Sequence, residues 1–283
     1  MRIGAHVSSR GRGLPGAARS ASALGADAVQ VFASNPRGWA PPPASSFDRA
    51  AADAAAWRAA GARPLFFHAP YPLNVASANA EFRARSIELG RMTAALAEAV
   101  GVEGLVIHAG SAGDATPRSE ALSRAAATIL AIAAGVERSR VLIELTAGGA
   151  GSIAATLAEA RELFDACGDD PHLGLCLDTC HLFAAGYALD APEGVAAAFG
   201  ELHDLGLDRR LALVHANDSK GDRGSRLDRH ADIGDGGIGV EGFRAILAQP
   251  AVRRATAVIL ETPGDDARRA RDIALLKELA SGP

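Results

Sequence analysis

Leu105-Val106-Ile107-His108 is one of six short apolar runs that each end in a residue able to bind a metal. Continuous apolar runs of this length are typical of strands buried on both faces, as in a parallel sheet covered by helices. If the sheet closes into a barrel, the carboxyl ends of all its strands meet at one mouth. The sequence therefore predicts that imidazoles and carboxylates converge there as a metal site. The other five runs are Leu65-Phe66-Phe67-His68, Val141-Leu142-Ile143-Glu144, Leu175-Cys176-Leu177-Asp178, Leu211-Ala212-Leu213-Val214-His215 and Val258-Ile259-Leu260-Glu261.

The rest of the chain completes a pattern of eight strands that alternate with helices. Two further strands are expected at Arg2–Val7 and Asp27–Ala33, ahead of the six runs. The pattern predicts an α/β fold, a single-domain (β/α)8 TIM barrel over residues 1–283. An open, doubly wound sheet is the structural alternative, but it would not bring all six terminal residues to one point. Helices are expected at Ala44–Ala60, Ala80–Val100, Ser119–Ala134, Ser152–Ala166, Val195–Asp204, Val240–Ala248 and Asp266–Leu279.

Composition and charge indicate a soluble enzyme and do not exclude a nucleic-acid partner. The sequence shows no N-terminal signal and no apolar stretch long enough to span a bilayer. Three cysteines without a C-x-x-C pair argue against a disulfide framework, so we expect a cytoplasmic location without a membrane partner. The formal net charge of −4 is unfavourable for a DNA-binding protein. Bound divalent cations would nevertheless concentrate positive charge at the mouth.

Three more ligand-type residues accompany the strand ends. His181 follows Asp178 by three positions, and Asp228 and His230 form a D-x-H pair in the loop after the seventh strand. Nitrogen and oxygen donors without thiolate suit zinc, manganese or iron better than magnesium or calcium. Nine candidates are too many for one ion and predict two or three. The candidate metal ligands are His68, His108, Glu144, Asp178, His181, His215, Asp228, His230 and Glu261.

A centre with several metal ions favours hydrolysis of a phosphate ester. Ions about 3.5–4 Å apart can neutralise the attacking and leaving oxygens and lower the pKa of bound water to about 7. Isomerisation of a sugar by a two-metal barrel is the competing interpretation. That reaction has no use for the set formed by His181, Asp228 and His230.

Basic and aromatic residues lie on the loops expected around this centre. Arg37 and Trp39 follow the second predicted strand, and Tyr71 follows His68. Arginine and aromatic side chains suit a phosphodiester backbone and an unstacked nucleotide. The alternative is that Trp39 packs its own loop and that the arginines are simply solvated. The loop that contains Asp228 adds Lys220, Arg226 and Arg229 to the candidate DNA contacts.

Two further signals allow more than one interpretation. Gly234-x-Gly236-x-x-Gly239 matches the dinucleotide-binding fingerprint, but it follows a polar loop where that motif requires a strand. We instead expect these glycines to let the backbone turn tightly near a phosphate. His6 ends the first strand, and it is either a further residue of the mouth or a hydrogen-bonded core residue.

The sequence resembles the endonuclease IV family, the zinc-dependent apurinic/apyrimidinic endonucleases of base-excision repair. The resemblance runs from Ile3-Gly4-Ala5-His6-Val7-Ser8 to Glu261-Thr262, almost the whole chain. Its most specific stretches are the segment 177–187 and the loop from Asn217-Asp218-Ser219-Lys220 to Asp228-Arg229-His230. All nine positions at which the family carries its metal ligands hold the expected residue type.

The resemblance implies three zinc ions, with manganese or iron as possible substitutes, and double-stranded DNA containing abasic sites as the substrate. The implied reaction is hydrolysis of the phosphodiester 5′ to the abasic site by a monomer that acts on the bacterial nucleoid. Glu144 and Glu261 would be its catalytic carboxylates, while Arg37 and Tyr71 would probe the DNA gap. The implied ligand sets are Glu144 with His68 and His108, Glu144 with Asp178, His215 and Glu261, and His181 with Asp228 and His230.

The sequence departs from the family pattern beside the ligands. Leu145 stands where relatives usually carry a polar residue, Gly149 where glutamine is usual, and Pro72 where an aliphatic residue is common. None of these is a ligand. We expect them to affect the metal affinity and the reaction rate, and the way the mouth loops enter the DNA. A non-catalytic DNA-binding relative remains a third hypothesis, against which the intact ligand set argues.

Overall fold

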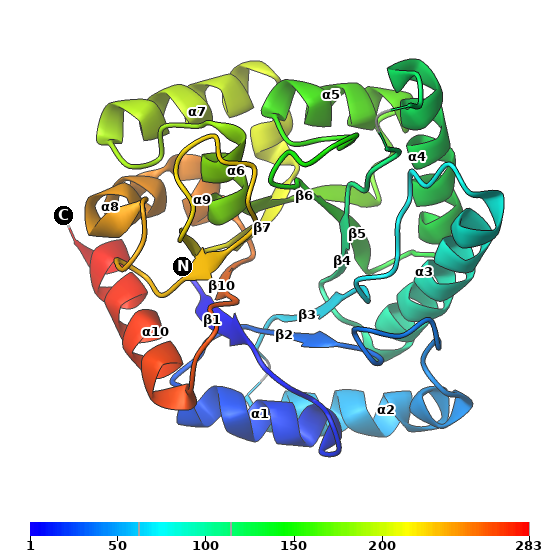
Figure 1. Ribbon diagram of the computed structural model, residues 1–283. Coiled ribbons are helices and arrows are strands. Elements are labelled where there is room, and N and C mark those ends of the chain that lie inside the picture. Colours follow the sequence, from blue (N-terminus) through cyan, green and yellow to red (C-terminus); the bar gives the residue numbers. More distant parts are fainter. Residues whose placement is uncertain (62, 114, 283) are drawn as a thin grey trace.

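Eight parallel strands close into a barrel, as the sequence predicts (Figure 1). The structure is a computed structural model that describes residues 1–61, 63–113 and 115–282. Each strand pairs with its neighbour in sequence, and β10 closes the barrel by pairing with both β7 and β1. The strands are β1 (Ile3–His6), β2 (Val29–Phe32), β3 (Leu65–His68), β4 (Gly104–His108), β5 (Arg140–Glu144), β6 (Leu173–Asp178), β7 (Leu211–His215) and β10 (Ala257–Leu260).

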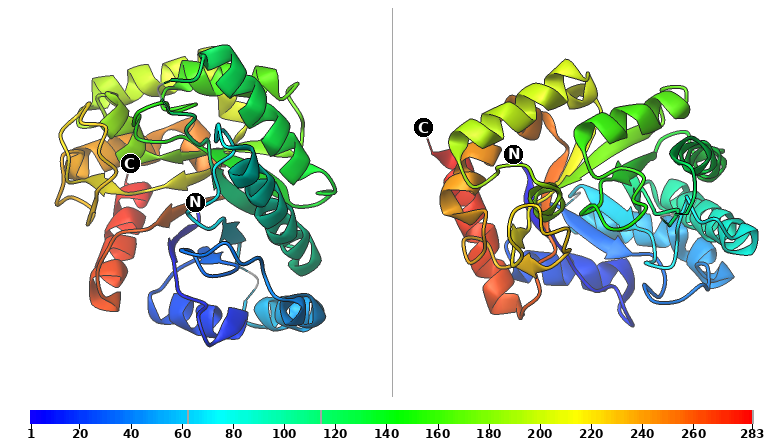
Figure 2. Two further views of the ribbon diagram at one scale, coloured as in Figure 1. Left: turned by 45° about the vertical axis from the view of Figure 1, so that its right-hand side comes forward. Right: turned by 45° about the horizontal axis from the view of Figure 1, so that its top comes forward.

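Helices surround the strands on the outside in every view (Figures 1 and 2). The C-terminal helix α10 lies beside the first strand and completes the ring, where Lys277 Nζ donates to the Gly25 carbonyl at 2.7 Å. The helices are α1 (Gly13–Ala23), α2 (Ala44–Ala59), α3 (Ala80–Val100), α4 (Arg118–Ala133), α5 (Leu157–Ala166), α6 (Thr179–Ala185), α7 (Pro192–Asp204), α8 (Gly239–Ala248), α9 (Pro250–Arg254) and α10 (Asp266–Ser281), with a 3-10 turn at Leu207–Arg209.

The structure differs from the predicted elements where side chains compete for the backbone. The predicted helix over Ser152–Ala166 begins only at Leu157, because Thr156 and Glu159 form a capping box there. The preceding residues instead cross to the neighbouring loop, where Ser152 bridges to Ser111. Three helices were not predicted, namely α1, α6 and α9. None of the helices in the described ranges is long and apolar enough to cross a membrane.

Alternation along the strands separates two apolar layers. One set of side chains packs between the strands and the helices. A smaller separate cluster is formed by residues at alternate positions, apart from the neighbours Ala212 and Leu213. This smaller cluster fills the barrel interior below the mouth. Its members are Ala28, Phe66, Val106, Leu142, Cys176, Ala212, Leu213, Ala257 and Ile259.

Candidate metal centre at the mouth of the barrel

All eight strands present one side chain to the top layer of the barrel interior. Each lies two residues beyond an interior position, so it points to the same side of its strand. Six of the eight are predicted metal ligands, and the other two are His6 and Gln30. The layer consists of His6, Gln30, His68, His108, Glu144, Asp178, His215 and Glu261.

Glu144 lies at the centre of this layer, and its side chain is 1% exposed. His68 Nε2 and His108 Nε2 approach its Oε2 at 3.2 and 3.4 Å, while His215 Nδ1 approaches its Oε1 at 3.1 Å. One carboxylate thus faces imidazoles from three different strands. Ligand atoms of His68, His108 and Glu144 all lie within 4.8 Å of one another, close enough to hold one cation.

A second group of ligand atoms shares Glu144 with the first. His215 Nδ1 lies 3.3 Å from Glu261 Oε2 and 4.0 Å from Asp178 Oδ2. Strand pairing sets Asp178 directly opposite His215. Glu144, Asp178, His215 and Glu261 each contribute an atom to a set within 4.8 Å. This group is therefore richer in carboxylate than the first.

A third group lies above the barrel, on α6 and on the loop after β7. Asp178 caps α6 by accepting from the His181 amide at 3.0 Å, which places the His181 ring one turn beyond β6. His230 is held by a two-stranded hairpin, β8 (Asp218–Ser219) with β9 (His230–Ala231). Asp228 lies between the two rings, 3.3 Å from His181 Nε2 and 3.2 Å from His230 Nε2. Asp178 Oδ2 is 3.6 Å from His230 Nε2, so Asp178 belongs to this group as well as to the second.

Hydrogen bonds determine which nitrogen each histidine presents. Carbonyl oxygens can only accept, so Nδ1 of His68 carries the proton that it shares with the Ala69 carbonyl at 2.7 Å. Nδ1 of His181 likewise donates to the Leu145 carbonyl at 2.8 Å. Both rings therefore direct Nε2 at the carboxylates, and Nε2 is the nitrogen left to bind a cation. Fixing the outer nitrogen in this way is typical of histidines that bind metals.

Charges in the metal-free site are strongly coupled. Burial by itself would raise the pKa of Glu144, but the imidazoles of His215 and His108 hold it well below its usual value. Burial opposes protonation of His181 and His230, but Asp178 and Asp228 raise their pKa values to about 10 and about 9. Burial also disfavours the charge on Asp228, yet the two imidazoles beside it, of His181 and His230, keep its pKa below the usual value. A positive charge at the third group is thus favoured by its surroundings.

The residues present fit divalent cations with nitrogen and oxygen ligands. Within the described ranges, His181 Nε2 and His230 Nε2 are buried atoms without a hydrogen-bond partner, although both face carboxylates. A buried imidazole nitrogen left in this state suits a cation that shares the same carboxylates. Cys176 and Cys180 also lie near the site, and burial raises the pKa of each thiol to about 12 in the metal-free protein.

Two residues that hold the ligands were missed by the sequence analysis. Asn217 Nδ2 donates to Asp178 Oδ2 at 2.6 Å, and its Oδ1 accepts from the Glu261 amide at 2.8 Å. Gln30 Nε2 donates to Glu261 Oε1 at 2.6 Å. The two-residue alternation after Ala28 could have indicated Gln30, whereas nothing in the sequence pattern singles out the Asn217 contacts. His6 belongs to the mouth, since its Nδ1 lies 3.1 Å from Glu261 Oε1.

The candidate DNA contacts are all exposed on the mouth loops. Tyr71 is 58% exposed, and its amide donates to the Pro36 carbonyl at 2.9 Å, which joins its loop to that of Arg37. Trp39 packs against Phe82 of α3, with ring centroids 6.1 Å apart, rather than against its own loop. The remaining exposed candidates are Arg37, Lys220, Arg226 and Arg229.

The glycine motif has a different role from the one predicted. The amides of Gly234, Gly236 and Gly239 donate to Asp218 Oδ2 at 3.0, 3.1 and 3.2 Å, so they surround a carboxylate of this chain where a phosphate was expected. A Cβ at position 236 would lie 2.5 Å from Asp218 Oδ1, which explains the glycine there. The expected phosphate contact at this motif is therefore wrong.

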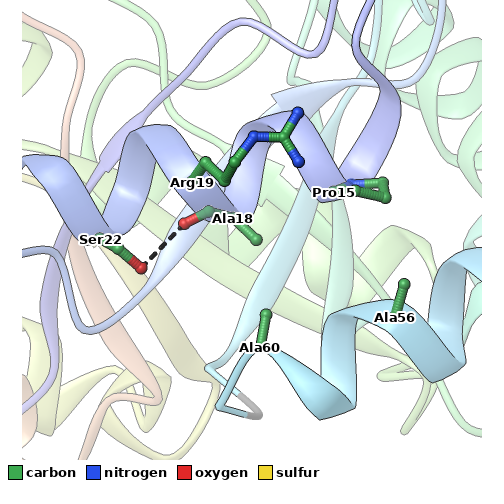
Figure 3. A pocket seen from close by; sticks show the side chains of 6 residues that line it. All are labelled: Pro15, Ala18, Arg19, Ser22, Ala56 and Ala60. Carbon is green, nitrogen blue, oxygen red and sulfur yellow. Dashed lines mark hydrogen bonds between the residues drawn. The ribbon is translucent and has the colours of Figure 1, made fainter.

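A hollow of about 390 Å³ lies on the outside of the barrel, between α1 and α2 (Figure 3). Half of its lining residues are alanines, and none is a candidate ligand. The hollow does not contribute to the metal centre. Its lining consists of Pro15, Ala18, Arg19, Ser22, Ala56 and Ala60.

Comparisons with known proteins agree with this geometry. Residues 18–279 match the model of the xylose isomerase-like TIM barrel family. The probable endonuclease 4 of Streptomyces coelicolor is 39% identical over 99% of this chain and 95% of its own length. The crystal structure of endonuclease IV from Thermus thermophilus superimposes with a TM-score of 0.86 at 34% identity, covering 99% of this chain and 98% of the other. A D-tagatose 3-epimerase-like protein has a TM-score of 0.74 at 21% identity, covering 99% and 97%, a likeness of fold alone. The chain belongs to the endonuclease IV family of the xylose isomerase-like TIM barrels.

Proposed function

We propose that this protein is a zinc-dependent endonuclease that hydrolyses the DNA phosphodiester 5′ to an abasic site. The products would be a 3′-hydroxyl and a 5′-deoxyribose phosphate. The observation that carries the proposal is the set of three adjoining ligand groups, in which Glu144 is shared by the first two and Asp178 by the last two. The nearby family members with endonuclease names support the same reaction class.

In this proposal the three ligand groups would hold three zinc ions. His68, His108 and Glu144 would hold the first, and Glu144 with Asp178, His215 and Glu261 the second. His181, Asp228 and His230 would hold the third. Manganese or iron could substitute for the zinc ions. Bound zinc would supply positive charge to the phosphate oxygens and lower the pKa of water toward about 7.

Within this centre the chain's own residues position the reactants. Glu261 is 16% exposed, so solvent reaches its carboxylate and it is suited to orient the attacking water. Glu144 is 1% exposed and faces imidazoles from both sides, which suits a bridging carboxylate. Asn217 would hold Asp178 and Glu261 in fixed positions relative to each other, because it contacts both. No side chain is required as a general acid if the departing oxygen is neutralised at the third group.

Substrate binding is assigned to the five exposed residues of the mouth loops. Tyr71 and Arg37 lie on joined loops and would enter the gap left by the missing base. Arg226 adopts a positive φ of 58°, held by donation from its amide to the Ala184 carbonyl at 2.9 Å. It lines a hollow of about 240 Å³ with Gly148, Gly149 and Gly151, where small residues leave room for a DNA phosphate. Lys220 and Arg229 would add sequence-independent phosphate contacts.

Selectivity for abasic DNA would arise from the low cost of extruding a sugar that carries no base. Stacking and pairing of that nucleotide are already lost, so flipping it requires less free energy than flipping an intact nucleotide. Base-specific contacts are therefore unnecessary.

The competing function is epimerisation or isomerisation of a sugar on the same barrel. Fold likeness at 21% identity is compatible with it. The third ligand group and the exposed arginines favour the nuclease, since a sugar reaction on one or two metals needs neither.

One zinc-loaded preparation should be assayed side by side on duplex DNA with a single synthetic abasic site and on D-tagatose. We expect nicking of the DNA and no change in the sugar. Epimerisation without nicking would favour the competing function, and binding of abasic DNA without turnover would favour a non-catalytic relative.

A further inference from the structure

Gln30 occupies an unusual position in the top layer of the barrel. Six of the eight side chains in that layer are candidate ligands, and Gln30 is a neutral amide placed among them with 0% exposure. Its Nε2 lies 2.6 Å from Glu261 Oε1, and its Oε1 lies 3.0 Å from His215 Nε2. The amide therefore contacts two candidate ligands of one ion at once.

The orientation of the amide follows from its neighbours. An ionised Glu261 can only accept hydrogen bonds, so the atom of Gln30 facing it must be the nitrogen. The amide oxygen then faces His215, and an oxygen in this position can only accept. His215 must accordingly carry a proton on Nε2, so Nδ1 is the nitrogen that can give up its proton to bind a cation. Nδ1 is the atom that faces Glu144 Oε1 at 3.1 Å and Glu261 Oε2 at 3.3 Å.

We propose that Gln30 is a positioning residue that sets the tautomer of His215 and the orientation of Glu261 for the second metal ion. One contact directs the free nitrogen of His215 into the second ligand group. The other engages Oε1 of Glu261 and so leaves Oε2 for the ion. The inference rests on the proposed metal centre and adds to it a residue that itself binds no metal.

Burial increases the effect that these two contacts have on metal affinity. Gln30 also lies 3.0 Å from His6 Nδ1, so no water is needed to complete its surroundings. Hydrogen bonds to the outer atoms of metal ligands typically contribute 10- to 100-fold to metal affinity. An apolar side chain of similar length would remove both contacts and leave the His215 proton free to occupy either nitrogen.

The test compares the wild type with Gln30→Met and Gln30→Glu. Long-range proton–nitrogen correlation spectra of the metal-free proteins, recorded at a pH high enough for His215 to lose one proton, report which of its nitrogens stays protonated. The signal is assigned through a His215→Asn variant. Zinc release to a chromogenic chelator, from fully loaded protein, reports affinity without any use of DNA. Thr93→Val is the matched control, because Thr93 is equally buried but bonds only to the Leu89 carbonyl within α3.

We expect Gln30→Met to mix the two His215 tautomers and to weaken one zinc by 10- to 100-fold, while the Thr93→Val control behaves as the wild type. Gln30→Glu keeps an acceptor for His215 and removes the donor to Glu261, so it should retain the tautomer yet still release zinc faster. If Gln30→Met does not fold, Gln30→Glu still tests the contact between Gln30 and Glu261.

Wild-type His215 protonation together with wild-type zinc release in the folded variants would overturn the inference. A wild type that binds no zinc would instead refute the proposed metal centre. The two failures are distinguishable because the tautomer is measured in the absence of metal.

Discussion

Asp218 provides a quantitative test of how the third ligand group is held. Its side chain is 0% exposed and accepts five backbone N–H groups. Two of them, from Ser219 and Ile238, reach Oδ1, and the three glycine amides of the 234–239 motif reach Oδ2. The same residue belongs to β8, whose partner strand carries His230. The carboxylate therefore fixes the loop that presents a proposed ligand.

Replacing Asp218 with asparagine should destabilise the protein substantially. Whichever oxygen becomes the amide nitrogen, at least two N–H groups lose an acceptor and face a donor. Each unsatisfied buried group costs about 1–3 kcal/mol, so we expect a loss of at least about 2 kcal/mol in the free energy of unfolding. For a chain of this size, that corresponds to a Tm lower by at least about 4 °C.

Thermal unfolding by circular dichroism measures the effect, and zinc content after gel filtration reports its consequence for the site. Asp222→Asn is the matched control, because Asp222 is exposed on the same loop and its side chain lies outside this network. We expect the Asp218 variant to lose zinc at the third group and the control to retain it. A Tm within about 1 °C of the wild type with full zinc content would refute the reasoning.

Three further predictions concern the metal centre. Glu261→Gln should lower kcat by about 100- to 1000-fold, the size of effect seen when one electrostatic group of an active site is removed. Binding of abasic DNA in a gel-shift assay should be nearly unchanged, and undiminished turnover would remove the proposed role of Glu261. Asp228→Asn should reduce bound zinc by one ion per chain in elemental analysis, because it removes the carboxylate that lies between His181 and His230. Full zinc with full activity would contradict the three-metal arrangement. In metal-free protein the raised pKa values of His181 and His230 mean that their charged forms stabilise the fold fully below about pH 6.5. That stability should be lost as pH rises through about 9 to 10 in urea unfolding, and a rise over this range would contradict it.

The barrel and the ligand strands could be predicted because one rule, alternation, governs them. Every predicted ligand at a strand end lies at the mouth, because parallel strands share a direction and interior residues recur every second position. His181 could be predicted from its spacing to Asp178, since both belong to one helix cap. These inferences need only local geometry and the closure of the sheet.

Contacts that depend on how loops fold could not be predicted in the same way. The glycines at 234–239 match a phosphate-binding motif, yet only the folded chain places Asp218 among their amides. Asn217 contacts Asp178 and Glu261 across two strands, a relation that no spacing along the sequence encodes. The backbone carbonyl of Leu145 accepts from His181, a contact that does not depend on which side chain stands at this position.

The most direct test of the central claim is a nicking assay on duplex DNA with one synthetic abasic site, without added magnesium. The protein should be assayed before chelation, after prolonged chelation and after addition of zinc, with the ends of the products identified. We predict a cut immediately 5′ of the site that leaves a 3′-hydroxyl, disappears on chelation and returns with zinc. A cut that survives complete removal of metal, or no cut by protein that contains three zinc ions, would contradict the account.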